Sequence, residues 1–271
     1  MRRVVVKVGS AVLTQDGTIA LDRMQNLVDF LSELKDKYEV ILVSSGAVAA
    51  GYTKLKLDRA VLKNKQALAA IGQPVLLDKY AKKFSNYDVV ISQVLVTSAN
   101  LNKIDDIKRV KATIDTLLEN GVIPIVNEND ATATEELELG DNDQLSAYIT
   151  KHTDSDILII LSDIDAYYDK DPRAYNDAKV LSVVDAISDD ELTKDVTPNN
   201  LFATGGIVTK LKAGSFLLAS GIDMFLASGF DLSDVRSFML ESKHKGGTLF
   251  TKGVKIWMWF LWELPIMQKL F

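Results

Sequence analysis

The sequence predicts a three-layer α/β fold, in which helices cover both faces of a mostly parallel sheet. Short apolar segments rich in β-branched residues recur along the chain, and such segments are typical of strands buried on both faces. The predicted strands are Val4–Gly9, Glu39–Ser45, Asp88–Val96, Gly121–Asn127, Asp156–Ser162 and Gly221–Ser228. Helical patterns alternate with them, which predicts right-handed crossovers between parallel strands. The predicted helices are Asp22–Lys37, Asn64–Phe84, Asp105–Asn120, Asp143–Lys151 and Lys210–Ala219.

Length and composition limit the classes of protein that fit this chain. Its 271 residues are 47% hydrophobic and 25% charged, a globular composition with enough residues for one large domain or two lobes. A net charge of −6 gives no general attraction to nucleic acid, so small molecules or other proteins are the expected partners. The chain has no cysteine and two histidines, which excludes disulfides, thiolate metal sites and a cysteine nucleophile.

The first residues do not resemble an export signal. An apolar run follows two arginines, but Lys7 interrupts it and no signal-peptide core follows. A cytoplasmic location is therefore expected, with no membrane among the partners.

Ligands of parallel sheets bind beyond the carboxyl ends of the strands, so the residues after each strand carry most information. Lys7, Gly9 and Ser10 end the first strand and offer a cation, a close backbone approach and a hydroxyl to a phosphate. A lysine that merely reaches solvent at a strand end is an equal alternative. After the second strand, Ser44–Gly51 begins a helix of small residues, which suits an anion or a tight helix–sheet contact.

Two polar clusters follow the fourth strand: NEND at Asn127–Asp130 and GDND at Gly140–Asp143. Residues 131–139 between them are interpreted as a short hairpin or excursion, so both clusters can lie over the same strand end. Aspartate accepts from an ammonium group and asparagine donates to a carboxylate, which together suit an amino-acid ligand. Turn formation and helix capping are the alternative, and Asp143 could be a plain N-cap. Calcium is set aside because GDND lacks the EF-hand pattern.

The second half of the chain carries two candidate nucleotide segments. Ser162 and Asp163 end a strand, and the tyrosines and proline turn that follow could enclose a purine and ribose, or form an ordinary surface loop. Thr204–Lys210 places paired glycines, hydroxyls and a lysine at a helix start, as a polyphosphate requires. The P-loop and dinucleotide fingerprints are both missing, so phosphate binding would use another architecture.

The ordered set of motifs is more specific than any single one. The set is KVGS, VSSGAVAAG, IPIVNENDA, GDNDQLSA, LSDIDAYYDKDPR, ATGGIVTKL and a terminal GGTLF. From about Val4 to Phe250, the chain closely resembles the amino acid kinase family, and the NEND and GDND pair resembles its glutamate 5-kinase branch. The resemblance implies an αβα sandwich of the carbamate kinase-like type, with the amino acid bound toward the N-terminal half and ATP toward the C-terminal half.

Matching of motif positions also implies roles for individual residues. The glutamate-binding residues would be Ser45, Asp130 and Asn142, with Asn127 close by. The nucleotide-binding residues would be Lys7, Gly9, Ser10, Ser162, Asp163, Thr204, Gly205, Gly206, Ile207, Val208, Thr209 and Lys210. Catalysis would depend on Lys7, Asp143 and Lys210, with Asp143 orienting both lysines beside the transferring phosphoryl group. Ser10 stands where threonine is common, which retains the hydroxyl.

The chemistry of the implied reaction agrees with these residues. The γ-carboxylate of glutamate is ionised at neutral pH, so its attack needs no general base and no histidine. The enzyme must align the phosphoryl group and neutralise charge, which two lysines, backbone N–H groups and Mg²⁺ on the ATP phosphates would do. The product would be L-glutamyl 5-phosphate, the first intermediate of proline biosynthesis. The alternatives are an aspartate or acetylglutamate kinase and a non-catalytic sensor of the same fold.

Residues 1–251 are expected to form the kinase domain, and 252–271 a separate hydrophobic extension. The extension holds Trp257, Trp259 and Trp262 and is interrupted too early for a membrane span. It is interpreted as packed on the body or a subunit interface, as a segment with little structure, or, less readily, as an interfacial anchor. No RNA-modification-type (PUA) domain is expected. The resemblance further implies a homo-oligomer, feedback inhibition by proline and a possible glutamyl phosphate reductase partner.

Overall fold

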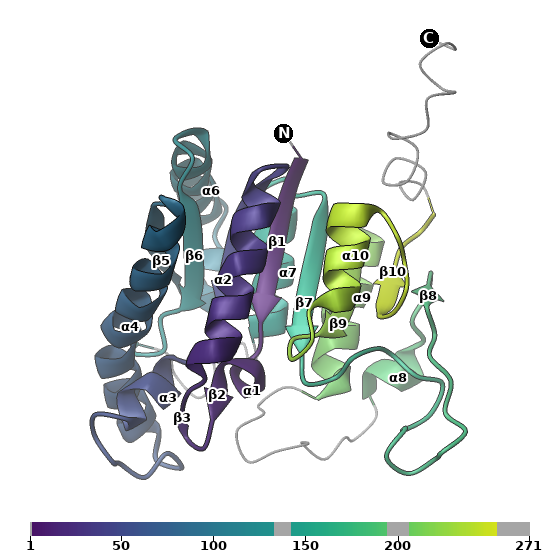
Figure 1. The fold of residues 1–271 in the computed structure, drawn as a ribbon, viewed down its shortest axis with the longest axis horizontal. Coiled ribbons are helices and arrows are strands. Elements are labelled where there is room, and N and C mark those ends of the chain that lie inside the picture. Colours follow the sequence, from purple (N-terminus) through teal and green to yellow (C-terminus); the bar gives the residue numbers. More distant parts are fainter. Residues whose placement is uncertain (1, 133–141, 194–205, 254–271) are drawn as a thin grey trace.

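The computed structural model describes residues 2–132, 142–193 and 206–253 (Figure 1). Its main sheet has the strand order β5-β6-β4-β1-β7-β9-β10-β8. The strands are β1 (Arg2–Val8), β4 (Tyr38–Ser44), β5 (Ile91–Val96), β6 (Ile123–Glu128), β7 (Ile157–Ser162), β8 (Val183–Val184), β9 (Asp223–Ser228) and β10 (Thr248–Phe250). All neighbouring strands pair in parallel except β9 and β10. The prediction of a mostly parallel sheet is thus confirmed.

Helices cover both faces of this sheet. They are α1 (Ser10–Leu13), α2 (Leu21–Lys35), α3 (Ala47–Tyr52), α4 (Leu62–Phe84), α5 (Ser98–Leu101), α6 (Ile104–Glu119), α7 (Asn142–His152), α8 (Asp189–Thr193), α9 (Ile207–Ala219) and α10 (Ser233–Glu241). One core lies between the sheet and α2, α4 and α10, and a second lies between the sheet and α6, α7 and α9. Figure 1 shows the first group of helices in front of the sheet and the second behind it. The three-layer prediction is confirmed.

Alternation along the strands decides which layer each side chain enters. Val4, Val6 and Val8 of β1 belong to the core under α2 and α4, whereas Val5 belongs to the core under α6, α7 and α9. Successive strand residues point to opposite faces, so Lys7 is directed toward the α7 and α9 layer. This parity, rather than any local motif, determines what the lysine can contact.

The predicted strand and helix boundaries lie within three residues of the observed ones, with two kinds of exception. The prediction that β5 is buried on both faces is wrong. This strand lies at the sheet edge, where Gln93 and Leu95 are exposed and, of its six residues, Val96 alone is buried. Among the main-sheet strands and the helices of nine or more residues in the described part of the chain, three elements were not predicted, namely α10, β8 and β10. The two strands have only two and three residues, too few for a periodic pattern.

Helices α3 and α4 cross at very short range because both carry glycine at the crossing. A Cβ atom on Gly51 would lie 1.9 Å from the carbonyl oxygen of Leu68, and one on Gly72 would lie 1.7 Å from that of Ala47. A tight contact thus accounts for the small residues of α3, as the alternative interpretation held, although the partner is a helix and not the sheet.

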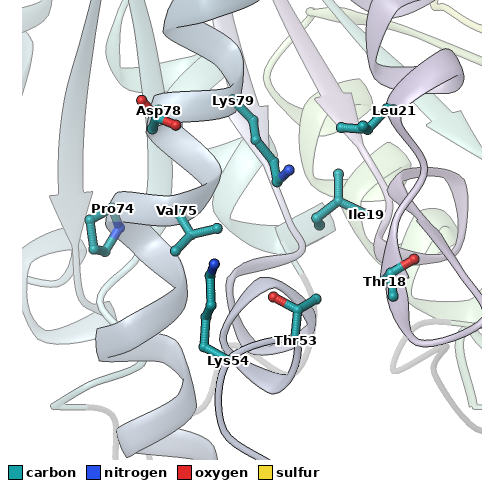
Figure 2. Close-up of a pocket in the computed structure, with 9 residues that line it drawn as sticks. All are labelled: Thr18, Ile19, Leu21, Thr53, Lys54, Pro74, Val75, Asp78 and Lys79. Atoms are coloured by element: carbon teal, nitrogen blue, oxygen red, sulfur yellow. The ribbon is translucent and has the colours of Figure 1, made fainter.

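The outer face of α4 borders an open cleft of about 590 Å³. Figure 2 shows Pro74, Val75 and Lys79 of α4 facing Lys54 and Ile19 across it. Ile19 belongs to a small hairpin of β2 (Thr14–Gln15) and β3 (Thr18–Ile19), which follows α1. The opposite face of α4 is turned toward the sheet and contributes Leu76, Tyr80 and Phe84 to the core.

Several expectations concern residues outside the described part of the chain. They are the hairpin over 131–139, of which only the first two residues are described, the ligand roles of Thr204 and Gly205, and the tryptophan-rich extension. Among the helices that the structure does describe, none combines the length and apolar character needed to cross a membrane.

Candidate active site

The loops that carry the candidate residues meet at one edge of the sheet. Strands β4, β1 and β7 are adjacent and parallel, so their carboxyl ends lie together, at the lower edge in Figure 1. Gly9 and Ser10 follow β1, and the Gly9 amide donates to the carbonyl oxygen of Leu161 in β7 at 3.0 Å. The first loop is thereby tied to the loop that holds Ser162.

Three charged side chains from distant parts of the chain meet at this edge. Asp143 Oδ1 lies 2.5 Å from Lys7 Nζ, and Asp143 Oδ2 lies 3.1 Å from Lys210 Nζ. Their relative exposures are 0%, 1% and 2%, so all three charges are removed from bulk water. Desolvating such charges is costly even when they are paired, and a buried pair therefore contributes little net stability. The cluster is better explained by function than by folding.

Thr209 adds a neutral group to this cluster. Its hydroxyl lies 2.8 Å from Asp143 Oδ2 and 2.9 Å from the carbonyl oxygen of Gly206. The carboxylate thus contacts both lysines and one hydroxyl, and Asp143 is the second residue of α7 rather than its N-cap. The plain N-cap interpretation of Asp143 does not describe its position.

The residues expected to hold an amino acid gather on the β4 side of the lysine cluster. Asn142 Nδ2 lies 3.0 Å from the carbonyl oxygen of Ser44, 3.0 Å from Ser45 Oγ and 2.9 Å from Asn127 Oδ1. Asn142, the first described residue of the GDND motif, therefore does contact the strand end where NEND begins. Asp130 is half-buried just beyond β6. Of the four predicted residues, Asn142 contacts both Ser45 and Asn127, and Asp130 lies three positions along the chain from Asn127.

The turn after Ser45 requires glycine. Gly46 has φ = 101°, a left-handed conformation that residues with a Cβ rarely adopt, and it directly precedes α3. The serine loop can therefore change direction immediately after Ser45 and leave that hydroxyl next to Asn142.

A cavity of about 740 Å³ opens on the other side of the lysine cluster. Its wall is the continuous segment Asp163–Arg173, with Leu181, Glu191, Ile207, Val208 and Leu211 opposite. This volume is within the range of small-ligand and cofactor sites. The tyrosine and proline segment predicted to enclose a purine does line a cavity of suitable size.

Hydrogen bonds fix the side chains of this cavity. The Tyr167 hydroxyl donates to Glu191, and that of Tyr168 donates to Asp165 at 3.0 Å. Burial, together with the Glu191 carboxylate, raises the pKa of Tyr167, which stays a donor at neutral pH. Ser162 Oγ donates to Asp163 Oδ1 at 3.0 Å.

The helix start at Gly206 faces this region. Ile207 and Val208 form the first turn of α9 and line the cavity, while Lys210 one turn later contacts Asp143. The exposed N–H groups and the helix dipole at such a start favour a phosphate. The order along α9 therefore places a helix end suited to an anion between the cavity and the lysine cluster.

Sequence reasoning missed some of the cavity residues. Glu191 comes from the short helix α8, in a segment without a motif, and its only sequence signal would have been its acidic charge. Leu211 lies one helical turn beyond Ile207, so helical periodicity could have identified it.

Comparison with known proteins decides the family. The family model described as "Amino acid kinase family" matches residues 2–228. The chain belongs to the amino acid kinase family. Among its curated relatives, the glutamate 5-kinase of Wolinella succinogenes is 51% identical over 258 residues, covering 93% of this chain and 99% of that protein. The glutamate 5-kinase of Leishmania donovani is 49% identical, covering 92% and 95%.

Solved structures of other kinases share the fold at much lower identity. An isopentenyl phosphate kinase substrate complex superposes with a TM-score of 0.65 at 17% identity, covering 92% of this chain and all of that one. UMP kinase from Ureaplasma parvum gives a TM-score of 0.57 at 18% identity, covering 93% and 99%. These likenesses bear on the fold alone, which is the amino acid kinase fold that the sequence predicts.

Proposed function

We propose that this chain is a glutamate 5-kinase, which transfers the γ-phosphoryl group of ATP to the γ-carboxylate of L-glutamate. The observation that carries the proposal is the buried cluster in which Asp143 holds Lys7 and Lys210. The cluster lies between the asparagine and serine group on one side and the 740 Å³ cavity on the other. Its glutamate 5-kinase relatives match nearly the whole chain at about half identity.

Glutamate would bind at the ends of β4 and β6. Asn142 and Ser45 supply amide and hydroxyl groups for its carboxylate, and Asp130 supplies a carboxylate for its ammonium group. Asn127 orients Asn142 by accepting its side-chain N–H at 2.9 Å. ATP would occupy the cavity along Asp163–Arg173, with its phosphates directed to Gly9, Ser10 and the first turn of α9.

Phosphoryl transfer requires alignment and charge neutralisation more than acid–base catalysis. The γ-carboxylate is already ionised, and its oxygen attacks phosphorus as the bond to the ADP oxygen breaks. The two ammonium groups stabilise negative charge on the transferring phosphoryl oxygens, from fixed positions in a site shielded from water. Asp143 holds those ammonium groups in place and accepts no proton in the reaction. The products are L-glutamyl 5-phosphate and ADP, and this reaction begins proline biosynthesis.

Mg²⁺ would be held mainly by the nucleotide. Among the described residues, no group of three acidic or histidine side chains could form a metal site. Asp143, the carboxylate nearest the reaction, is already shared by two lysines. The ion supplies neutralisation of phosphate charge when bound with ATP, and the protein's own contribution is the lysine pair. Homo-oligomer formation, inhibition by proline and transfer of the product to a reductase are further proposals, which rest on the family resemblance of the sequence.

The test is ATP- and Mg²⁺-dependent ADP release with glutamate, aspartate, N-acetylglutamate, carbamate and UMP offered separately. Hydroxylamine in the assay traps an acyl phosphate as a hydroxamate. We expect turnover with glutamate alone and formation of the γ-hydroxamate. Turnover with another acceptor would assign the chain to another branch of the family. Saturable glutamate or ATP binding without any turnover would make it a sensor.

A further inference from the structure

A buried tyrosine lies behind the amino-acid loop, on helix α4. Tyr80 lies on the inner face of α4 with 0% exposure, packed among apolar residues such as Leu76 and Phe84. A phenylalanine would fill the same space, and a buried hydroxyl is costly unless it is hydrogen-bonded. The hydroxyl of Tyr80 is bonded: it lies 2.9 Å from Ser44 Oγ.

The direction of this hydrogen bond follows from the proton count. Ser44 Oγ donates its single proton to the carbonyl oxygen of Ser45 at 3.1 Å. Tyr80 must therefore be the donor to Ser44 Oγ, since a serine hydroxyl has one proton to give. Burial raises the pKa of Tyr80, so its hydroxyl remains protonated and able to donate at any working pH.

Ser44 connects this tyrosine to the amino-acid site. Alternation along β4 points the Ser44 side chain to the α4 layer, because Val40 and Leu42 belong to the same core. Its backbone carbonyl faces the site and accepts from Asn142 Nδ2 at 3.0 Å. Ser44 thus accepts two hydrogen bonds: its side chain accepts one from Tyr80 of α4, and its backbone carbonyl accepts one from Asn142 at the start of α7.

We infer that Tyr80 is a positioning residue for glutamate: through Ser44, it fixes the Ser44–Gly46 loop in the orientation that presents Ser45 to the substrate. This inference rests on the proposed function of the site. The loop needs such support because Gly46, which has no Cβ, restricts the backbone less than any other residue would. Its observed φ of 101° is one of several conformations open to glycine. The lysine cluster and the nucleotide cavity lie on other strand ends, so the effect should fall on the amino acid.

The test is steady-state kinetics of the Tyr80→Phe variant with glutamate and ATP varied separately. A single buried neutral hydrogen bond corresponds to a change of about two- to tenfold in an equilibrium. We expect the KM for glutamate to rise by about three- to tenfold, while kcat and the KM for ATP change by less than about twofold. Unchanged glutamate KM in a folded variant would overturn the inference.

Two control variants distinguish positioning of the Ser44–Gly46 loop by Tyr80 from a general weakening of the packing of α4. Tyr87→Phe removes another tyrosine hydroxyl near the end of α4, one that is exposed and donates to Asp29. Lys79→Ala changes the neighbouring residue, which lines the outer cleft of Figure 2. Both should leave the glutamate KM unchanged. If either raises it as much as Tyr80→Phe does, the effect belongs to α4 as a whole and the inference fails.

A double-mutant cycle tests the connection through Ser44. Ser44→Ala should raise the glutamate KM in the same direction, and adding Tyr80→Phe to it should have no further effect. Multiplicative effects would show that Tyr80 acts by another route. Absence of activity in the unaltered chain would contradict the proposed function. In that case isothermal titration of glutamate tests Tyr80→Phe directly, with the same fold-change expected in Kd.

Discussion

Replacement of Asp143 by asparagine is the sharpest perturbation of the proposed machinery. The substitution keeps the size and shape of the side chain but removes the charge that Lys7 and Lys210 share. The two ammonium groups lie on opposite oxygens of one carboxylate, so they are less than about 8 Å apart, where two like charges repel by at least about 2 kcal/mol at an effective dielectric of 20. The variant therefore loses two attractions and retains one repulsion.

The magnitude of the effect follows from burial. Removal of one partner of a buried ion pair costs about 3–5 kcal/mol, because the remaining charges are left without compensation. Asp143 has 0% exposure, so no discount for solvent screening applies. We expect the free energy of unfolding to fall by about this amount. We expect kcat to fall by about a hundredfold or more, as for loss of other groups that orient transition-state charge.

The assay is urea denaturation combined with ADP release at saturating glutamate and ATP. Asp78→Asn is the matched control, since Asp78 pairs with Lys82 on the surface with both side chains more than half exposed. That variant should change stability by less than about 1 kcal/mol and leave kcat unaltered. If folded Asp143→Asn retains kcat within about threefold of the unaltered chain, the carboxylate does not orient the lysines and the reasoning is refuted.

Three further predictions concern other parts of the chain. Asp130→Ala should raise the KM for glutamate at least about tenfold, through loss of a charged partner for the ammonium group, with the KM for ATP as the internal control. Gly72→Ala should lower stability by at least about 1–3 kcal/mol in thermal unfolding, because the new Cβ would lie 1.7 Å from a backbone oxygen. Gly214→Ala should cost much less, because its Cβ would meet side-chain atoms alone: the flexible end of Met224 at 2.9 Å, and Ile187 and Phe250 at 3.4 Å. Burial acts to raise the pKa of Asp115, but hydrogen bonds from Lys111 and Arg3 outweigh it and lower that pKa below the unfolded value. Its stabilisation is therefore present above the unfolded pKa and lost as pH falls through the folded pKa, so Asp115→Asn should destabilise by up to about 1 kcal/mol at pH 7 and by less under acid conditions.

The layers of the fold could be predicted because each is encoded by a local pattern. Buried parallel strands are continuous apolar runs, and the long helices between them repeat at helical spacing. The missed strands β8 and β10 lack such a pattern: Thr248–Phe250 has three residues, and it pairs antiparallel to β9 through a contact with no local signal. The missed helix α10 does carry one, since its buried Val235, Phe238 and Met239 recur at helical spacing. The edge position of a strand likewise has no signal in the sequence, which is why Asp88–Val96 was expected to be buried on both faces.

The candidate site was predictable at the level of positions but not of contacts. Parallel topology brings strand ends together, so Lys7, Ser45 and Asn127 could be expected at one edge. Lys210 and Asp143 are 67 residues apart, and their contact depends on the packing of α7 and α9 on the same face of the sheet. No local pattern predicts that contact, which only the family resemblance implied. A role for Tyr80 could not be predicted, because the sequence pattern of an aromatic residue on the buried face of a helix indicates only a core position.

The start of α7 explains why one short motif can serve both substrates. Asn142 and Asp143 are consecutive residues, and consecutive residues of a helix point about 100° apart. Asn142 therefore reaches the serine loop of β4 and Asn127 of β6, whereas Asp143 reaches the lysines of β1 and α9. A rigid helix end thus fixes the distance between the amino-acid group and the phosphoryl-transfer group. Because in-line transfer depends on that distance, a shift of α7 should impair kcat even where both substrates still bind.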